Sequence, residues 1–66
     1  MENKVEELRK NMGLSQEDLA KDLGISRQTI SSIERGRYNP SLELAFTISN
    51  YFKTTIEDIF KYREEN

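Results

Sequence analysis

A chain of 66 residues has room for one domain over residues 1–66, and it buries so little apolar surface that its monomer is expected to be marginally stable. It contains no cysteine and no histidine, which excludes disulfides and Cys- or His-ligated metals and removes the usual general base of enzymes. We therefore expect no enzyme activity, no metal and no cofactor. No apolar segment approaches the roughly 20 residues that span a bilayer, and the N-terminus lacks a signal-peptide pattern, so a cytoplasmic protein is expected.

The charge of the chain is unevenly distributed. The formal net charge is -2 and the pI is near 5.1, whereas a nucleic-acid binder is usually basic. Residues 27–39, however, hold three arginines against one glutamate, while residues 1–26 and residues 40–66 each have two more acidic than basic side chains. A single basic segment in an acidic frame is compatible with local contact to phosphates, although a solvated surface produces such clusters by chance as well.

The first predicted helix covers residues 3–12. Its apolar residues recur at i, i+3 and i+7 on one face, namely Val5, Leu8 and Met12. Gly13 follows at the position of a left-handed C-terminal cap.

The second and third helices are predicted from their capping residues. Ser15 and Asp18 have the spacing of a capping box, and the helix that they open ends at Gly24, with Leu19, Ala20 and Leu23 facing the core. Ser26 is a good N-cap for a third helix that runs to about residue 35. Glu34 is expected to form a local salt bridge with a neighbouring arginine.

Two more helices follow a loop at residues 37–39. The fourth covers residues 42–52, and either Asn39 before Pro40 or Ser41 caps it. Thr55 and Asp58 have the spacing of a second capping box, which opens a short fifth helix. The predicted apolar face of these helices consists of Leu42, Leu44, Ala45, Ile48, Tyr51, Phe52, Ile56, Ile59 and Phe60. A short strand around residues 61–63 is only weakly indicated, so the fold class is all-α with five helices.

Residues 16–35 form the informative unit, a helix, a three-residue turn and a second helix. Ala20 lies where the helices are expected to cross, and Gly24 suits a backbone with positive φ. Only Ile30 and Ile33 are apolar in the second helix, so most of its side chains face solvent or a partner. The major groove of B-DNA is about 12 Å wide and admits one such helix.

Four motifs occur in order along almost the whole chain: S-Q-E-D-L-A at 15–20, S-R-Q-T-I at 26–30, N-P-S at 39–41 and I-E-D-I-F at 56–60. In these residues the chain resembles the Xre family of regulators, which includes the phage Cro and lambda-type repressors. The resemblance implies a compact lambda-repressor-like domain that binds double-stranded DNA. It is most similar to the small stand-alone repressors of the family, so no small-molecule effector domain is expected.

The resemblance also implies roles for matched positions. Side chains near the bases would be those of Arg27, Gln28, Thr29, Ser31 and Ser32. Side chains on phosphates would be those of Gln16, Arg35, Arg37, Tyr38 and Asn39. Phage members often place amides where this chain has Ser31 and Ser32, and small hydroxyls discriminate bases weakly, so specificity is expected to depend on Arg27, Gln28 and DNA shape.

The expected function is a homodimeric transcriptional regulator, a repressor in its simplest form, that binds an inverted repeat. We hypothesise that the fifth helix and the tail supply the two-fold contact, with Phe46, Ile59, Phe60 and Tyr62 as interface candidates; aromatic residues at helical spacing are more often core. The alternative is a protein-interaction module, such as an antitoxin or anti-repressor with the same fold, which the acidic pI keeps open.

Overall fold

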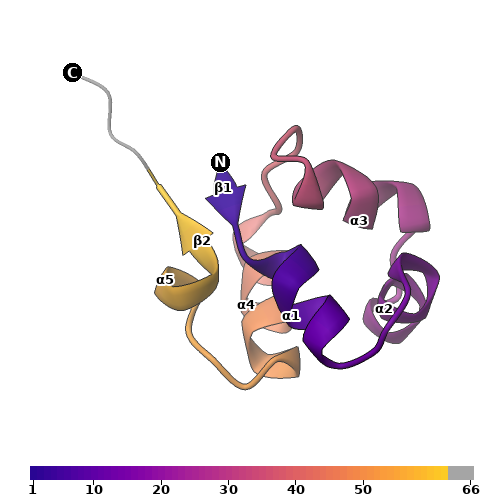
Figure 1. Ribbon diagram of the computed structural model, residues 1–66. Helices are drawn as coiled ribbons and strands as arrows, with labels where there is room; N and C mark the ends of the chain where they lie inside the picture. The colour runs from indigo at the N-terminus through magenta and orange to yellow at the C-terminus, as the bar shows by residue number, and fades with distance from the viewer. Residues whose placement is uncertain (63–66) are drawn as a thin grey trace.

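In the computed structural model, which describes residues 1–62, five helices pack around one core and a two-stranded sheet joins the ends of the described chain (Figure 1). The helices are α1 Val5–Asn11, α2 Gln16–Leu23, α3 Arg27–Glu34, α4 Leu42–Tyr51 and α5 Ile56–Ile59. The strands are β1 Glu2–Asn3 and β2 Phe60–Lys61, which pair antiparallel with Glu2 opposite Lys61 and Asn3 opposite Phe60. This architecture confirms the predicted five-helix domain. None of the helices in residues 1–62 has the length and apolar character needed to span a bilayer.

The helices begin where the capping residues predict. Ser15 and Asp18 form a complete capping box, because each side chain accepts a hydrogen bond from the backbone N–H of the other residue. The hydroxyls of Ser26 and Ser41 likewise accept from the third residue of α3 and of α4, so Ser41, and not Asn39, is the cap of α4. Thr55 caps α5 in the same way, but its box is incomplete, since the Asp58 carboxylate accepts from Thr54 Oγ1 at 3.2 Å instead.

The start and the buried face of α1 differ from the prediction. The helix begins at Val5, because the backbone of Asn3 pairs with Phe60 in the sheet and its side chain accepts from the Val5 N–H at 3.1 Å. Met12 is 53% exposed and does not belong to the core. Arg9, one turn after Val5, is buried in its place.

The terminal strand lies one residue earlier than predicted. It consists of Phe60–Lys61, and Arg63 lies outside the described residues. Its partner β1 was not predicted, because two residues carry no periodic signal.

The core contains side chains from every helix. Six large side chains have no measurable exposure, and each such burial contributes about 1.5–3 kcal/mol. They are Val5, Leu19, Ile30, Ile33, Ile48 and Ile59. Ala20, Ala45 and Phe60 complete the buried set. The predicted inward position of Leu42 is wrong, since this first residue of α4 is 70% exposed.

A buried ion pair joins α1 to α3. Arg9 Nε donates to Glu34 Oε2 at 2.7 Å, and Arg9 Nη2 donates to Glu34 Oε1 at 3.2 Å. The two side chains are only 8% and 3% exposed, and Arg9 Nη1 also donates to the carbonyl oxygen of Leu14 at 2.8 Å. The hydrogen bond that Arg9 donates to Glu34 raises the pKa of Arg9 by more than desolvation lowers it, so the guanidinium is held fully charged.

A second side-chain bond joins α2 to α4. Tyr51 Oη donates to Asp22 Oδ2 at 2.6 Å. This hydrogen bond to a carboxylate raises the pKa of Tyr51 above its ordinary value, and burial of the ring acts in the same direction.

Removing only one partner of the Arg9–Glu34 ion pair is expected to lower the free energy of unfolding strongly. Glu34→Leu leaves the Arg9 guanidinium buried without its carboxylate, at a cost of about 3–5 kcal/mol. The double variant Arg9→Met/Glu34→Leu removes both charges and is expected to be more stable than the single variant. Urea denaturation followed by circular dichroism measures both free energies of unfolding. A Glu34→Leu protein as stable as the wild type would contradict this account of the pair.

The Tyr51–Asp22 hydrogen bond is expected to stabilise the fold at neutral pH and to lose this effect at alkaline pH. Because the pKa of Tyr51 is higher in the folded protein than its ordinary 10.0, the bond stabilises the fold fully below that pH and is lost as the pH rises through the folded pKa. Tyr51→Phe should therefore melt at a lower temperature than wild type at neutral pH, and this difference should shrink at alkaline pH. Tyr38→Phe, at an exposed tyrosine, is the control and should show no such trend.

Candidate nucleic-acid interface

The turn between α2 and α3 fixes how the two helices cross. Gly24 has a φ of +72° and ends α2 in the left-handed conformation, while the N–H of Ile25 bonds back to the carbonyl oxygen of Ala20 at 3.0 Å. Ser26 then turns the chain into α3 with an extended backbone. Ala20 is only 3% exposed, as expected of a small residue packed between the two helices, which contact each other. The predicted helix-turn-helix unit is therefore present.

The third helix is held to the core by one narrow stripe. Ile30 and Ile33 have no exposed surface, and at about 100° per residue they leave most of the helix circumference outside the core. Arg27 and Gln28 are exposed, whereas Thr29, Ser31 and Ser32 are half-buried. All of these side chains are polar, so α3 presents a hydrophilic surface of charged, amide and hydroxyl groups.

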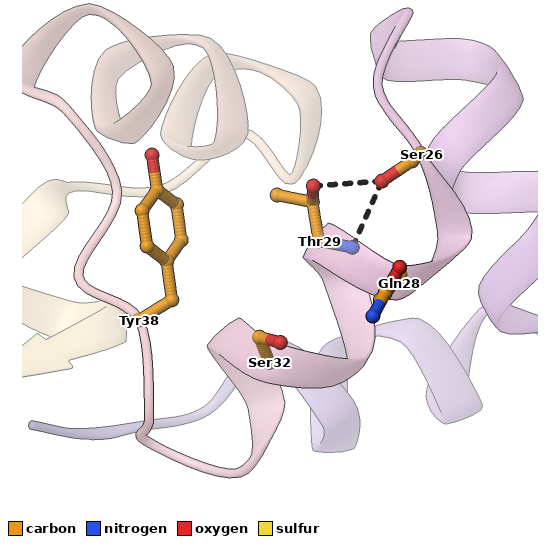
Figure 2. Close-up of a pocket in the computed structure, with 5 residues that line it drawn as sticks. All are labelled: Ser26, Gln28, Thr29, Ser32 and Tyr38. Carbon is orange, nitrogen blue, oxygen red and sulfur yellow. Dashed lines mark hydrogen bonds between the residues drawn. The ribbon is translucent and has the colours of Figure 1, made fainter.

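Part of this surface forms a hollow with the loop after α3 (Figure 2). Its lining residues are Ser26, Gln28, Thr29, Ser32 and Tyr38. Thr29 donates its backbone N–H to Ser26 Oγ at 3.1 Å, and the hydroxyls of the two residues lie 2.8 Å apart. Figure 2 shows the Tyr38 ring across the hollow from α3, with the hydroxyl of Thr29 turned away from it toward Ser26. The hollow therefore combines polar groups with an aromatic wall.

The opposite side of α3 is connected to α2 through a chain of side-chain bonds. Gln16 Nε2 donates to Glu34 Oε1 at 3.0 Å, and Arg27 Nη1 donates to Gln16 Oε1 at 3.4 Å. Glu34 is held in turn by Arg9. The first residue of α2 and the first residue of α3 are thus oriented by one buried carboxylate.

The partner of Glu34 differs from the prediction. The sequence suggests a neighbouring arginine, but the carboxylate bonds Arg9, which lies 25 residues away along the chain. The difference has a physical reason, because a buried carboxylate needs a buried cation, and the neighbouring Arg35 and Arg37 are both exposed.

The candidate phosphate-binding residues after α3 share one exposed loop. Arg35, Arg37, Tyr38 and Asn39 are all exposed, and Tyr38 retains 47% of its surface. The loop backbone is ordered by bonds to the end of α3, since the N–H groups of Arg37 and Tyr38 both reach the carbonyl oxygen of Ser32, at 3.0 and 3.3 Å. The guanidinium groups are therefore free to meet a ligand while their backbone is held.

The four candidate interface residues fall into two groups. Phe46 is 52% exposed and Tyr62 is 77% exposed, so both present apolar surface to solvent. Ile59 has no exposed surface and Phe60 is only 8% exposed, because both pack in the core of their own chain. Ile59 and Phe60 are therefore corrected to core residues, and the large exposed apolar side chains among the four candidates are those of Phe46 and Tyr62.

Three residues that shape this interface were missed as site residues by the sequence prediction. Arg9 bonds Glu34, which in turn holds Gln16. The sequence indicated this role only by placing a cation four residues after Val5, on the apolar stripe of α1. Ser26 was identified only as a cap and also lines the hollow. Asn3 donates Nδ2 to the carbonyl oxygen of Ile33, at the end of α3, at 2.8 Å, and no local pattern indicates that contact.

The likeness to known proteins covers nearly the whole chain. The helix-turn-helix family profile matches residues 5–59. An uncharacterized HTH-type transcriptional regulator of Methanocaldococcus jannaschii is 55% identical over 65 residues, which cover 98% of this chain and 98% of that protein. The regulator YgzD of Bacillus subtilis is 50% identical over 66 residues, with 100% of both chains covered. The HTH-type transcriptional activator BcrR of Enterococcus faecalis is 38% identical over 61 residues, 92% of this chain and 30% of its own length. The chain therefore belongs to the Xre-type helix-turn-helix family of transcriptional regulators.

Proposed function

We propose that this protein is a homodimeric transcriptional regulator that recognises an inverted-repeat operator by placing α3 in the major groove of double-stranded DNA. The observation that carries the proposal is the polar surface of α3, which is flanked by the exposed Arg27 at its start and by Arg35 and Arg37 after its end. Family membership supports the DNA-binding role. Repression is the simplest outcome, because a dimer on its operator excludes other proteins from that DNA.

The start of α2 is suited to the DNA backbone. Gln16 is the first residue of this eight-residue helix, where free N–H groups and the helix dipole favour a phosphate. An amide nitrogen has two N–H donors, and Glu34 uses one of them. The second N–H of Gln16 would bind a phosphate while the first keeps the side chain in place.

Base discrimination is assigned to the first turn of α3. The exposed Gln28 can form a bidentate pair with adenine, and the exposed Arg27 with guanine. Thr29, Ser31 and Ser32 are short, so the helix can approach the floor of the groove closely. Since hydroxyls discriminate bases weakly, sequence-dependent DNA shape would supply the rest of the specificity.

A dimer would read two half-sites about 34 Å apart, one turn of DNA. The exposed apolar residues Phe46 and Tyr62 support such an assembly. A hollow beside Tyr62, between β2 and α5, is also lined by Ile56 and Phe60 and bordered by the charged Glu57 and Lys61. Two copies related by a two-fold axis could cover this surface and pair its opposite charges.

The second candidate function is the protein-interaction module, which the net charge of -2 favours. In that case α3 would contact a protein partner in place of DNA. Salt dependence separates the two, because an interface that neutralises several phosphates loses affinity steeply with rising salt, whereas a protein interface responds less.

Two substitutions are expected to affect DNA binding differently. Gln28→Ala removes a base contact and should cost about 1–3 kcal/mol, with specificity relaxed at one operator position. Arg37→Ala removes a phosphate contact and should weaken binding to all sequences about equally, with the slope of log affinity against log salt reduced by about 1. An operator selected from random DNA, followed by fluorescence anisotropy titrations at several salt concentrations, measures both effects.

Uniform losses in both variants would contradict base contact by Gln28. If the wild-type protein shows no preference among random oligonucleotides at low salt, the DNA-binding proposal fails as a whole. Glu43→Ala, at an exposed side chain in the first turn of α4, serves as a control for surface substitution.

Charge placed in the proposed dimer surface is expected to separate the two copies. Phe46→Glu and Tyr62→Glu each put a carboxylate on an exposed apolar position, where a partner would have to desolvate it. Sedimentation equilibrium should show a shift toward monomer in both variants. Met12→Glu is the matched control, because Met12 is 53% exposed against 52% for Phe46 and lies on α1. Unchanged dimers in both variants would remove these residues from the interface.

A further inference from the structure

Asn3 connects three elements that are far apart in the sequence. Its backbone pairs with Phe60 across the terminal sheet, and its Oδ1 accepts from the Val5 N–H at 3.1 Å. Its Nδ2 donates to the carbonyl oxygen of Ile33 at 2.8 Å, across 30 residues of sequence. One half-buried amide thus contacts the first turn of α1 and the last turn of α3.

The Ile33 carbonyl group that Asn3 contacts also bonds the loop that follows α3. Carbonyls in the last turn of a helix lack an intrahelical partner, and side chains or the following backbone supply one. The Ile33 oxygen accepts from the Gly36 N–H at 3.0 Å in addition to the Asn3 amide. The next two N–H groups, of Arg37 and Tyr38, donate to the Ser32 carbonyl oxygen. The carbonyls of two adjacent residues in α3, Ser32 and Ile33, thus hold the backbone at the start of the loop.

The residue before β1 lies against the same loop, as Figure 1 shows for β1 and the chain that follows α3. Gly36 has a φ of +73°, and a Cβ built on it would lie 3.1 Å from the carbonyl oxygen of Met1. A larger residue at position 36 would therefore need the Met1 backbone to shift by a few tenths of an ångström, and the positive φ disfavours any side chain there as well. The N-terminal segment therefore contacts the last turn of α3 through the Asn3 side chain and the loop after it through the Met1 backbone.

We infer that Asn3 is a positioning residue for DNA binding: by bonding the Ile33 carbonyl it fixes the end of α3 and the loop that presents Arg35, Arg37 and Tyr38. The inference rests on the proposed function and adds a residue outside the helix-turn-helix unit to it. A loop that is already ordered has less conformational freedom to lose when its side chains meet phosphates. Ordering one long side chain costs about 0.5–1.5 kcal/mol, so loss of the bond should weaken DNA binding by roughly three- to tenfold.

The first test examines the loop without DNA. Asn3→Ser and Asn3→Asp both keep an oxygen that can accept from the Val5 N–H, and both remove the amide N–H that bonds Ile33; ionised Asp has no donor, and the Ser hydroxyl sits on a side chain one atom shorter than the amide. Asp also places a negative charge at the start of α1, which favours the helix, so this variant is expected to stay folded. Hydrogen exchange of the Gly36, Arg37 and Tyr38 amides should accelerate about tenfold, while core amides of α4 exchange as in the wild type. Unchanged exchange of these loop amides in a folded variant overturns the inference.

The second test links the loop to DNA. At a temperature where circular dichroism shows Asn3→Ser to be folded, its operator affinity should fall three- to tenfold, and its salt slope should fall with it as ordered phosphate contacts are lost. A merely structural role would lower the melting temperature and leave the salt slope of the folded protein unchanged. Asn50→Ser, at an exposed asparagine of α4, is the matched control and should match the wild type.

The outcomes separate this inference from the proposed function. If the wild type binds an operator and Asn3→Ser binds it with the same affinity and salt slope, the positioning role is wrong and DNA binding stands. If the wild type binds no DNA, the proposed function fails, and the exchange experiment alone decides whether Asn3 orders the loop.

Discussion

The buried Arg9–Glu34 pair is the constraint on which the candidate DNA-binding surface depends. Its bidentate geometry fixes the distance between α1 and α3, and its carboxylate oxygen also accepts from Gln16, which in turn accepts from Arg27. Two buried charges are expensive to desolvate, and they are tolerated here because the carboxylate receives three N–H donors. The pair therefore orders the first residues of α2 and α3, where phosphate and base contacts are proposed, before any ligand is present.

The acidic character of the chain and its proposed ligand are compatible because the charges are segregated. Glu34 is the single acidic residue of the basic segment at residues 27–39, and it is turned inward, with its side chain only 3% exposed. The exposed charges there are the guanidinium groups of Arg27, Arg35 and Arg37. Coulombic interactions between exposed charges fade beyond about 10 Å at ordinary salt. A local cluster of positive side chains can therefore attract phosphates even though the net charge of the whole protein is negative.

The sequence predicted the features whose causes are local and missed those whose causes are distant. Caps at Ser15, Ser26 and Thr55 were predictable, because a hydroxyl three residues before a helical N–H determines the bond by itself. The burial of Arg9 was not, since it depends on Glu34, which lies 25 residues away along the chain. Helix periodicity likewise gave Ile59 and Phe60 the correct inward position, which conflicts with their assignment to a dimer contact.

The terminal sheet shows how so short a chain can couple its two proposed surfaces. β2 borders the hollow where a second copy is proposed to bind, and β1 contacts the end of α3 through Asn3. The two strands are paired with each other, so a partner that ordered β2 would also order β1. A two-stranded sheet of this length is marginal alone, because it needs packing against other elements for stability. Dimer formation and ordering of the DNA-binding loop would then support each other through this sheet, with no additional domain required.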